Sequence, residues 1–202
     1  MSTIATVSGL AQEPIQLDKP DMNRGLNVMQ ALQNRHSERE FADKPLSHRD
    51  LSDLMWAAYG INREDGRHTA ASAINKQDID VYVLMESGSY KYDPANNQLV
   101  PVADGDNRAL IRGGQEDFPL APVNIVVVSD ISRFGLPDED ACGRLGAIDA
   151  GLVSQNIALF CAGNGLVTVP RASMDTDGLR KILKLPWDAM IVINNPVGYP
   201  AK

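Results

Sequence analysis

The sequence predicts an α+β fold in which helices cover a central sheet. Strand-like and helix-like segments alternate in a mixed order along its 202 residues. Residues 123–130 (VNIVVVSD) are nearly all apolar, as expected of a strand covered on both faces. Residues 89–102 (SYKYDPANNQLVPV) are typical of an antiparallel hairpin that turns between Asp93 and Asn97. A covered strand beside a hairpin indicates a sandwich of sheet and helices.

Helix signals flank this sheet. Residues 24–36 carry Leu26, Met29 and Leu32 at helical spacing. Residues 45–60 (PLSHRDLSDLMWAAYG) predict a well-defined helix, which Ser47 can cap and Gly60 can end. One face of this second helix is apolar: Leu51, Leu54, Met55 and Ala58.

The remaining elements follow in order. Residues 79–85 (IDVYVLM) predict a strand, residues 140–162 a long helix, and residues 166–170 a short strand. A helix over 176–183 and a final strand from residue 189 complete the chain. We expect Gly163 or Gly165 to end the long helix in a left-handed conformation.

Residues 1–22 show no such periodicity. We expect an extended or disordered N-terminal arm there, ahead of a single domain over 23–202. The first residues (MSTIATVSGLA) resemble the apolar half of a secretory signal but carry no positive charge. We expect a cytoplasmic protein, or a periplasmic one if residues 1–11 are the end of a signal peptide.

Composition excludes several function classes. A formal charge of −7 argues against nucleic acid as a partner, because phosphate backbones are bound through an excess of Lys and Arg. No run of 18 apolar residues predicts a membrane span. The two cysteines and three histidines show no metal-ligand spacing. P-loop, dinucleotide-binding and serine-hydrolase motifs are also missing.

One dense cluster of charge follows the first helix. Residues 34–41 (NRHSEREF) place Arg35, His36, Ser37 and Arg39 within five positions. Two arginines and a hydroxyl at that density suggest a receptor for an anion. The alternative is a solvated helix end whose local counter-charges are Glu38 and Glu40.

Four segments, in order, resemble the nitroreductase family of FMN-dependent oxidoreductases. They are NRHSEREF, TAASAINKQDIDVYVL, GLVSQNIALFCAGNGLVTVPRASMD and VINNPVGYP. The resemblance covers roughly residues 23–200, and the stretch over 54–73 with the hairpin is similar to the dehydrogenases of thiazole- and oxazole-forming peptide modification. It implies the nitroreductase fold, a mostly antiparallel sheet between helical layers in a three-layer sandwich.

The resemblance also implies roles for individual residues. Arg35, Ser37 and Arg39, with His36 beside them, would bind the phosphate and ribityl chain of FMN. Ser72, Asn75 and Gln77 would shape the loop at the edge of the flavin ring, with Asn75 hydrogen-bonded to that edge. Asp78 stands where the family commonly has proline, so the loop geometry is expected to differ. The alternative for Asn75 is an ordinary turn residue before the strand.

Further roles fall near the end of the chain. Arg171 and Ala172 match the loop that presents a backbone N–H to the flavin N5 atom. Arg171 reverses the charge that the family often has there, so it would favour an anionic substrate or the phosphates of the nicotinamide cofactor. Lys202 is the one basic residue after the closing strand that could reach the phosphate. Gly151, inside the long helix, suggests close packing against the flavin, a partner subunit or the sheet.

The implied activity is reduction of a nitroaromatic, a quinone or a similar small acceptor by NADH or NADPH in a ping-pong mechanism. The resemblance also implies a homodimer with the flavin at the subunit interface. No catalytic side chain is required, because the flavin performs the redox chemistry. The alternatives are a flavin dehydrogenase of the same fold that acts on a peptide or small molecule, and a flavin-binding protein without catalysis.

Overall fold

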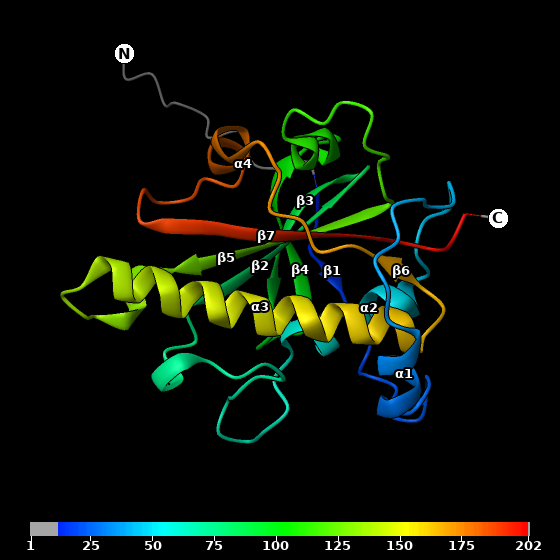
Figure 1. Cartoon of the computed structure of the whole chain (residues 1–202), viewed down its shortest axis with the longest axis horizontal. Helices are drawn as coiled ribbons and strands as arrows, with labels where there is room; N and C mark the ends of the chain where they lie inside the picture. The colour runs from blue at the N-terminus through cyan, green and yellow to red at the C-terminus, as the bar shows by residue number, and fades with distance from the viewer. Residues whose placement is uncertain (1–11, 202) are drawn as a thin grey trace, which may run out of the picture.

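A seven-stranded antiparallel sheet is the centre of the computed structural model, which describes residues 12–201 (Figure 1). Its strand order is β1-β4-β3-β2-β5-β7-β6. In chain order the strands are β1 (Ile15–Gln16), β2 (Ile79–Met85), β3 (Gly88–Asp93), β4 (Gln98–Asp104), β5 (Val123–Asp130), β6 (Val167–Thr168) and β7 (Ala189–Gly198). Every neighbouring pair runs antiparallel.

Helices cover both faces of this sheet. Figure 1 shows α1 (Val28–Asn34), α2 (His48–Tyr59) and α3 (Glu139–Gly163) on one side and α4 (Thr176–Ile182) on the other. Short 3-10 turns add to these helices: η1 (Ala73–Asn75), η2 (Arg108–Arg112) and η3 (Ile131–Phe134). The two faces hold separate apolar clusters, one beneath α2 and α3 and one beneath α4 and η2.

The central strand β5 shows why both faces are covered. Successive side chains of a strand point to opposite faces. Ile125 and Val127 join the cluster beneath α3, whereas Val126 and Val128 join the cluster beneath α4. All four are at most 1% exposed. The predicted α+β three-layer sandwich is confirmed.

The predicted capping of α2 is also confirmed. The Ser47 hydroxyl accepts from the backbone N–H of Asp50 at 3.0 Å, and Gly60 caps the other end. The predicted apolar face is buried: Leu51, Leu54, Met55 and Ala58. The long helix α3 ends at Gly163, and Gly165 just beyond it has the left-handed φ of 70° that was expected of one of these glycines.

The first helix differs from the expectation. α1 covers only Val28–Asn34, and Ala31 is its one buried residue among those described. Its apolar side chains face outward, with Met29 73% exposed and Leu32 47% exposed. The helical spacing predicted the element correctly, but within this chain no core covers its apolar face.

α3 is the longest helix and organises one side of the molecule. Among the described helices, only α3 is long and apolar enough to cross a membrane. Its inner side, however, is part of the core. Ala150, Val153 and Ile157 pack in the cluster shared with the sheet. Gly146 brings the helix close to β5, because a Cβ there would lie 2.2 Å from the Ser129 hydroxyl oxygen.

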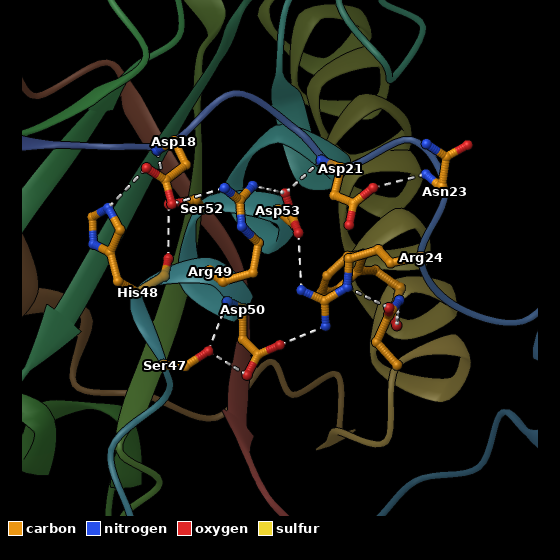
Figure 2. A network of polar contacts seen from close by, with 12 residues as sticks. Asp18, Asp21, Asn23, Arg24, Ser47, His48, Arg49, Asp50, Ser52 and Asp53 are labelled. Atoms are coloured by element: carbon orange, nitrogen blue, oxygen red, sulfur yellow. Dashed lines mark hydrogen bonds and ion pairs between the residues drawn. The ribbon is translucent and has the colours of Figure 1, made fainter.

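Part of the N-terminal arm joins the sheet, while residues 1–11 lie outside the described structure. β1 pairs antiparallel with β4, so the arm is extended there and forms an edge of the sheet. Beyond β1 a network of polar contacts fastens the arm to α2 (Figure 2). Arg24 reaches the carboxylates of Asp50 and Asp53 at 2.5 and 2.9 Å, and Arg49 reaches Asp53 and Asp18 at 3.2 and 2.9 Å.

Candidate functional site

Segment 35–39 leaves the end of α1 and runs along β6. Arg35 follows α1 in an extended conformation. The backbone N–H of Glu38 then donates to the Thr168 carbonyl oxygen at 3.0 Å, which holds the segment against β6. His36 lines a small cavity between this segment and α3, and Ser37 is exposed. The edge of the sheet therefore fixes the backbone that carries the two arginines.

Neither arginine of this segment has an acidic partner. Within residues 12–201, no ion pair joins Arg35 or Arg39 to a carboxylate. The Glu38 carboxylate instead accepts from the backbone N–H groups of Arg39 and Glu40, at 2.6 and 3.1 Å. These hydrogen bonds lower the pKa of Glu38. Because Glu38 binds the backbone, both guanidinium groups are left available for an external anion.

Arg171 and Ala172 lie between β6 and α4, where Arg171 forms a bridge to Asn194 of β7. The backbone N–H of Arg171 donates to the Asn194 carbonyl oxygen at 2.8 Å, and the Asn194 N–H donates back at the same distance. The N–H of Arg171 is therefore already used. Ala172 is exposed, and no described residue accepts from its N–H. Of the two residues assigned to the flavin N5 contact, only Ala172 has a donor to offer.

Arg171 was expected to present its charge to a substrate, but the structure buries its side chain. It is 9% exposed and lies over the Phe118 ring at 3.6 Å. Its guanidinium donates to the Ile111 carbonyl at 2.8 Å and to the Gln115 side-chain oxygen at 2.6 Å. Burial, and then the positive charge of Arg39, lower the pKa of Arg171. The side chain therefore pins the 111–118 segment and adds to the positive field around Arg39.

Ser72, Asn75 and Gln77 belong to the segment between α2 and β2, which runs from cyan to teal in Figure 1. The Ser72 hydroxyl accepts from the Gln77 N–H at 2.7 Å and closes the loop. Asn75 is exposed, and no described residue bonds its side-chain amide. The Asn75 amide is therefore accessible to solvent, and its contact with a flavin stays a prediction.

This loop has an unusual backbone. Ile74, Asn75 and Gln77 have φ values of 46°, 55° and 49°, in the left-handed region that side chains other than glycine rarely adopt. Each such residue costs roughly 1–2 kcal/mol. A conformation of this kind persists only where the surrounding structure enforces it, and such sites cluster where ligands bind.

Two buried carboxylates enforce this loop conformation, and the sequence assigned neither of them to the site. The carboxylate of Asp149, on α3, accepts from the Ala73 N–H at 2.7 Å. Asp78 accepts from the Ser129 hydroxyl at 2.6 Å, and both carboxylates are buried, at 0% and 2% exposed. Burial raises the pKa of Asp78 to about 6; the Ser129 hydrogen bond opposes this rise, and the neighbouring Asp149 adds to it. In the sequence, the only sign of this carboxyl pair was Asp78, which stands where the family commonly has proline.

The structure brings the predicted residues into two groups along α3. Segment 35–39 lies by the C-terminal end of α3, and loop 72–77 is tied to its middle at Asp149. His36 lines its cavity with Ala158 and Ala162, so about 9–13 residues of helix separate the groups, or roughly 14–20 Å at 1.5 Å per residue. Lys202 lies outside the described residues.

A cavity of about 450 Å³ opens beside the loop. Ser72, Asn75 and Gln77 line one side of it, and Arg63 and Arg67 line the other. Arg63 is held by the His68 carbonyl oxygen at 2.8 Å. Neither arginine was expected to belong to the site, because the resemblance assigned no role to residues 61–68.

Comparisons with known proteins agree with this fold. The chain is similar to a protein of Ralstonia eutropha JMP134, provisionally named a nitroreductase, whose crystal structure gives a TM-score of 0.88 at 34% identity and covers 96% of this chain and 92% of that one. A Methanocaldococcus jannaschii protein with the same provisional name is 29% identical over 195 residues, 92% of this chain and 97% of that protein. The NADPH:FMN oxidoreductase of Vibrio harveyi, in complex with NAD+, shares the fold at a TM-score of 0.64 and 17% identity, over 87% of this chain and 70% of that one. The model of the nitroreductase family matches residues 32–199. The chain belongs to the nitroreductase family, and that membership makes it an oxidoreductase.

Proposed function

We propose that this protein is an FMN-dependent oxidoreductase that uses NADH or NADPH to reduce a nitroaromatic, a quinone or a similar small acceptor by a ping-pong mechanism. The observation that carries the proposal is the pair of arginines, Arg35 and Arg39, on a fixed backbone with no acidic partner among the described residues. In a chain of formal charge −7, two unpaired guanidinium groups indicate a local site for an anion.

The residues present fit an FMN molecule. Arg35, Ser37 and Arg39 offer charged and hydroxyl donors for its phosphate and ribityl chain. The unpartnered Asn75 amide offers both a donor and an acceptor for the edge of the ring, and the Ala172 N–H offers one more donor.

In the reaction these residues bind and orient. Bound FMN would supply the hydride chemistry. Arg35 and Arg39 hold the phosphate end, and the strained loop 72–77 holds Asn75 in a fixed orientation against the ring edge. The cavity beside Arg63 and Arg67 gives a reactant room to approach the loop. No side chain is assigned a proton-transfer role.

We also propose that the protein acts as a homodimer with its flavin at the subunit interface. The outward face of α1 and the adjoining face of α3 support this proposal. Met29 is 73% exposed on α1, and Ile148 and Leu152 are 59% and 41% exposed on α3. Gly151 lies between these two residues of α3, and a Cβ added to it would meet no atom within 4 Å. Packing within one chain therefore does not explain this glycine.

The test of the flavin site is a pair of affinities. We expect Arg35→Gln and Arg39→Gln each to weaken FMN binding by about 1.5–3 kcal/mol, or roughly tenfold to a hundredfold in Kd, because each removes a charge-assisted hydrogen bond. Riboflavin, which lacks the phosphate, should lose much less. The control is Lys181→Gln, an exposed cation of α4 on the other side of the sheet, whose side chain makes no contact among the described residues. Unchanged FMN affinity, measured by quenching of flavin fluorescence, would refute the assignment.

A further inference from the structure

The strained loop 72–77 is held by two buried carboxylates that lie far apart in sequence. Asp149 reaches the loop from α3 and accepts the Ala73 N–H at 2.7 Å. Asp78 ends the loop, and its second oxygen lies 3.4 Å from the Ser72 hydroxyl that closes it. Because Ser72 and Ala73 are adjacent residues, the two carboxyl groups meet at one point of the loop, and both are buried, at 0% and 2% exposed. Like charges on two carboxyl groups at one buried site raise the pKa of one of them, which favours a proton held there.

We propose that Asp78 and Asp149 are positioning residues that share one proton, and that this proton locks loop 72–77 in the conformation that presents Asn75. When both carboxylates are charged, their repulsion loosens the loop. The inference rests on the proposed function in so far as Asn75 contacts the flavin. The hold of the carboxyl pair on the loop does not depend on any ligand.

Other groups around the pair do not supply the same switch. Tyr59 faces Asp78 from α2, and burial, followed by the charge of Asp78, raises its pKa, so it stays neutral. Arg133, from η3, donates to the Gln77 carbonyl at 2.8 Å but pairs with Asp80 and Asp130 at 3.0 and 2.9 Å. His68 stacks on Tyr59 with ring centroids 3.9 Å apart and is the remaining titratable neighbour.

The consequence is a loop whose order depends on pH. Like charges that cannot both be stabilised in a buried site keep one proton to a higher pH. If the loop opens, Asp78 returns to solvent and loses its proton at the usual lower pH. Opening therefore becomes easier as the pH rises from about 4 to about 6, because the open state binds fewer protons over that window.

The experiment measures hydrogen exchange of the Ala73 and Gln77 amides in flavin-free protein from pH 4 to pH 8, corrected for intrinsic exchange. We expect the protection factor of both amides to fall up to about a hundredfold in the wild type, following the difference between the closed and open pKa values of Asp78. Asp149→Asn can still accept from Ala73 and donate to Asp78 but cannot ionise. Burial still raises the pKa of Asp78 in this variant, so protection should still fall with pH, but by less than in the wild type.

Two further variants complete the design. Asp78→Asn removes the carboxylate whose pKa is raised and should give a flat profile, so the test does not depend on one substitution folding well. Asp140→Asn, an exposed acid-to-amide change on the same helix, should keep the wild-type fall. A fall of the same size in the wild type and both buried variants would overturn the inference.

Riboflavin affinity measured over the same pH range separates this inference from the proposed function. Riboflavin is the probe because the phosphate of FMN has its own ionisation near pH 6. Tight flavin binding with pH-independent protection overturns the carboxyl-pair inference and leaves the proposed function intact. A pH-dependent loop in a protein that binds no flavin overturns the proposed function and supports the inference.

Discussion

Gly151→Ala distinguishes packing within one chain from packing between two. Gly151 lies inside the 25-residue helix α3, where glycine is about 0.8–1.0 kcal/mol less favourable than alanine. In the isolated chain an added Cβ meets no atom within 4 Å. For a protein that stays monomeric, Gly151→Ala should therefore raise the free energy of unfolding by about 1 kcal/mol.

If the protein is a dimer as proposed, Gly151→Ala should instead be destabilising. If a partner helix or the flavin packs against Gly151, the added methyl group overfills that contact at a cost of about 1–3 kcal/mol. The cost exceeds the helix-propensity gain, so dimer affinity should fall by roughly tenfold. The assay is sedimentation equilibrium, together with urea unfolding at two protein concentrations, because unfolding of a dimer depends on concentration.

Two other glycines of α3 serve as controls. Gly143→Ala also places a Cβ in open space and should stabilise the protein by about 1 kcal/mol without affecting association. Gly146→Ala places a Cβ 2.2 Å from the Ser129 hydroxyl oxygen and should destabilise the chain itself. If Gly151→Ala behaves like Gly143→Ala, with unchanged association, the assignment of this face to the subunit interface is refuted.

Two further outcomes follow from side chains within one chain. Arg171→Met should lower the free energy of unfolding in urea by about 2–4 kcal/mol, since it leaves buried acceptors unpaired, whereas KM for NADPH should change little in the folded enzyme. A large rise in KM without loss of stability would restore the view that Arg171 binds substrate. Burial would raise the pKa of Asp50, but hydrogen bonds from Ser47, Tyr199 and Arg24 outweigh it and lower that pKa. Its contribution to stability is present above about pH 4 and is lost as the pH falls through the folded pKa, so Asp50→Asn should flatten the acid limb of unfolding measured between pH 5 and pH 2; an unchanged acid limb would contradict this.

Local patterns in the sequence predicted much of the fold. α2 could be predicted because its cap at Ser47, its apolar face and its terminal Gly60 all lie within one short segment. β5 could be predicted because a strand buried on both faces is apolar at nearly every position. β1 could not, because a two-residue strand exists only through its pairing with β4, more than eighty residues away.

The site was predictable to a lesser degree. The motif around Arg35 placed the expected anion site on a backbone that β6 holds, but no sequence pattern shows that Glu38 would bind the backbone and leave the arginines unpaired. The direction of the Arg171 side chain depends on the 111–118 segment, which carries no motif. The contact of Asp78 with Asp149 joins positions 71 residues apart and arises only when α3 packs on the sheet.

We propose that this nitroreductase-family protein carries a flavin that NADH or NADPH can reduce. The most direct test is the visible absorbance spectrum of the purified protein, reconstituted with FMN and recorded before and after anaerobic addition of NADH or NADPH. We expect oxidised-flavin bands that stay with the protein through gel filtration and bleach on addition of one of the two nucleotides. A protein that retains no flavin after reconstitution, or whose bound flavin neither nucleotide bleaches, would contradict it.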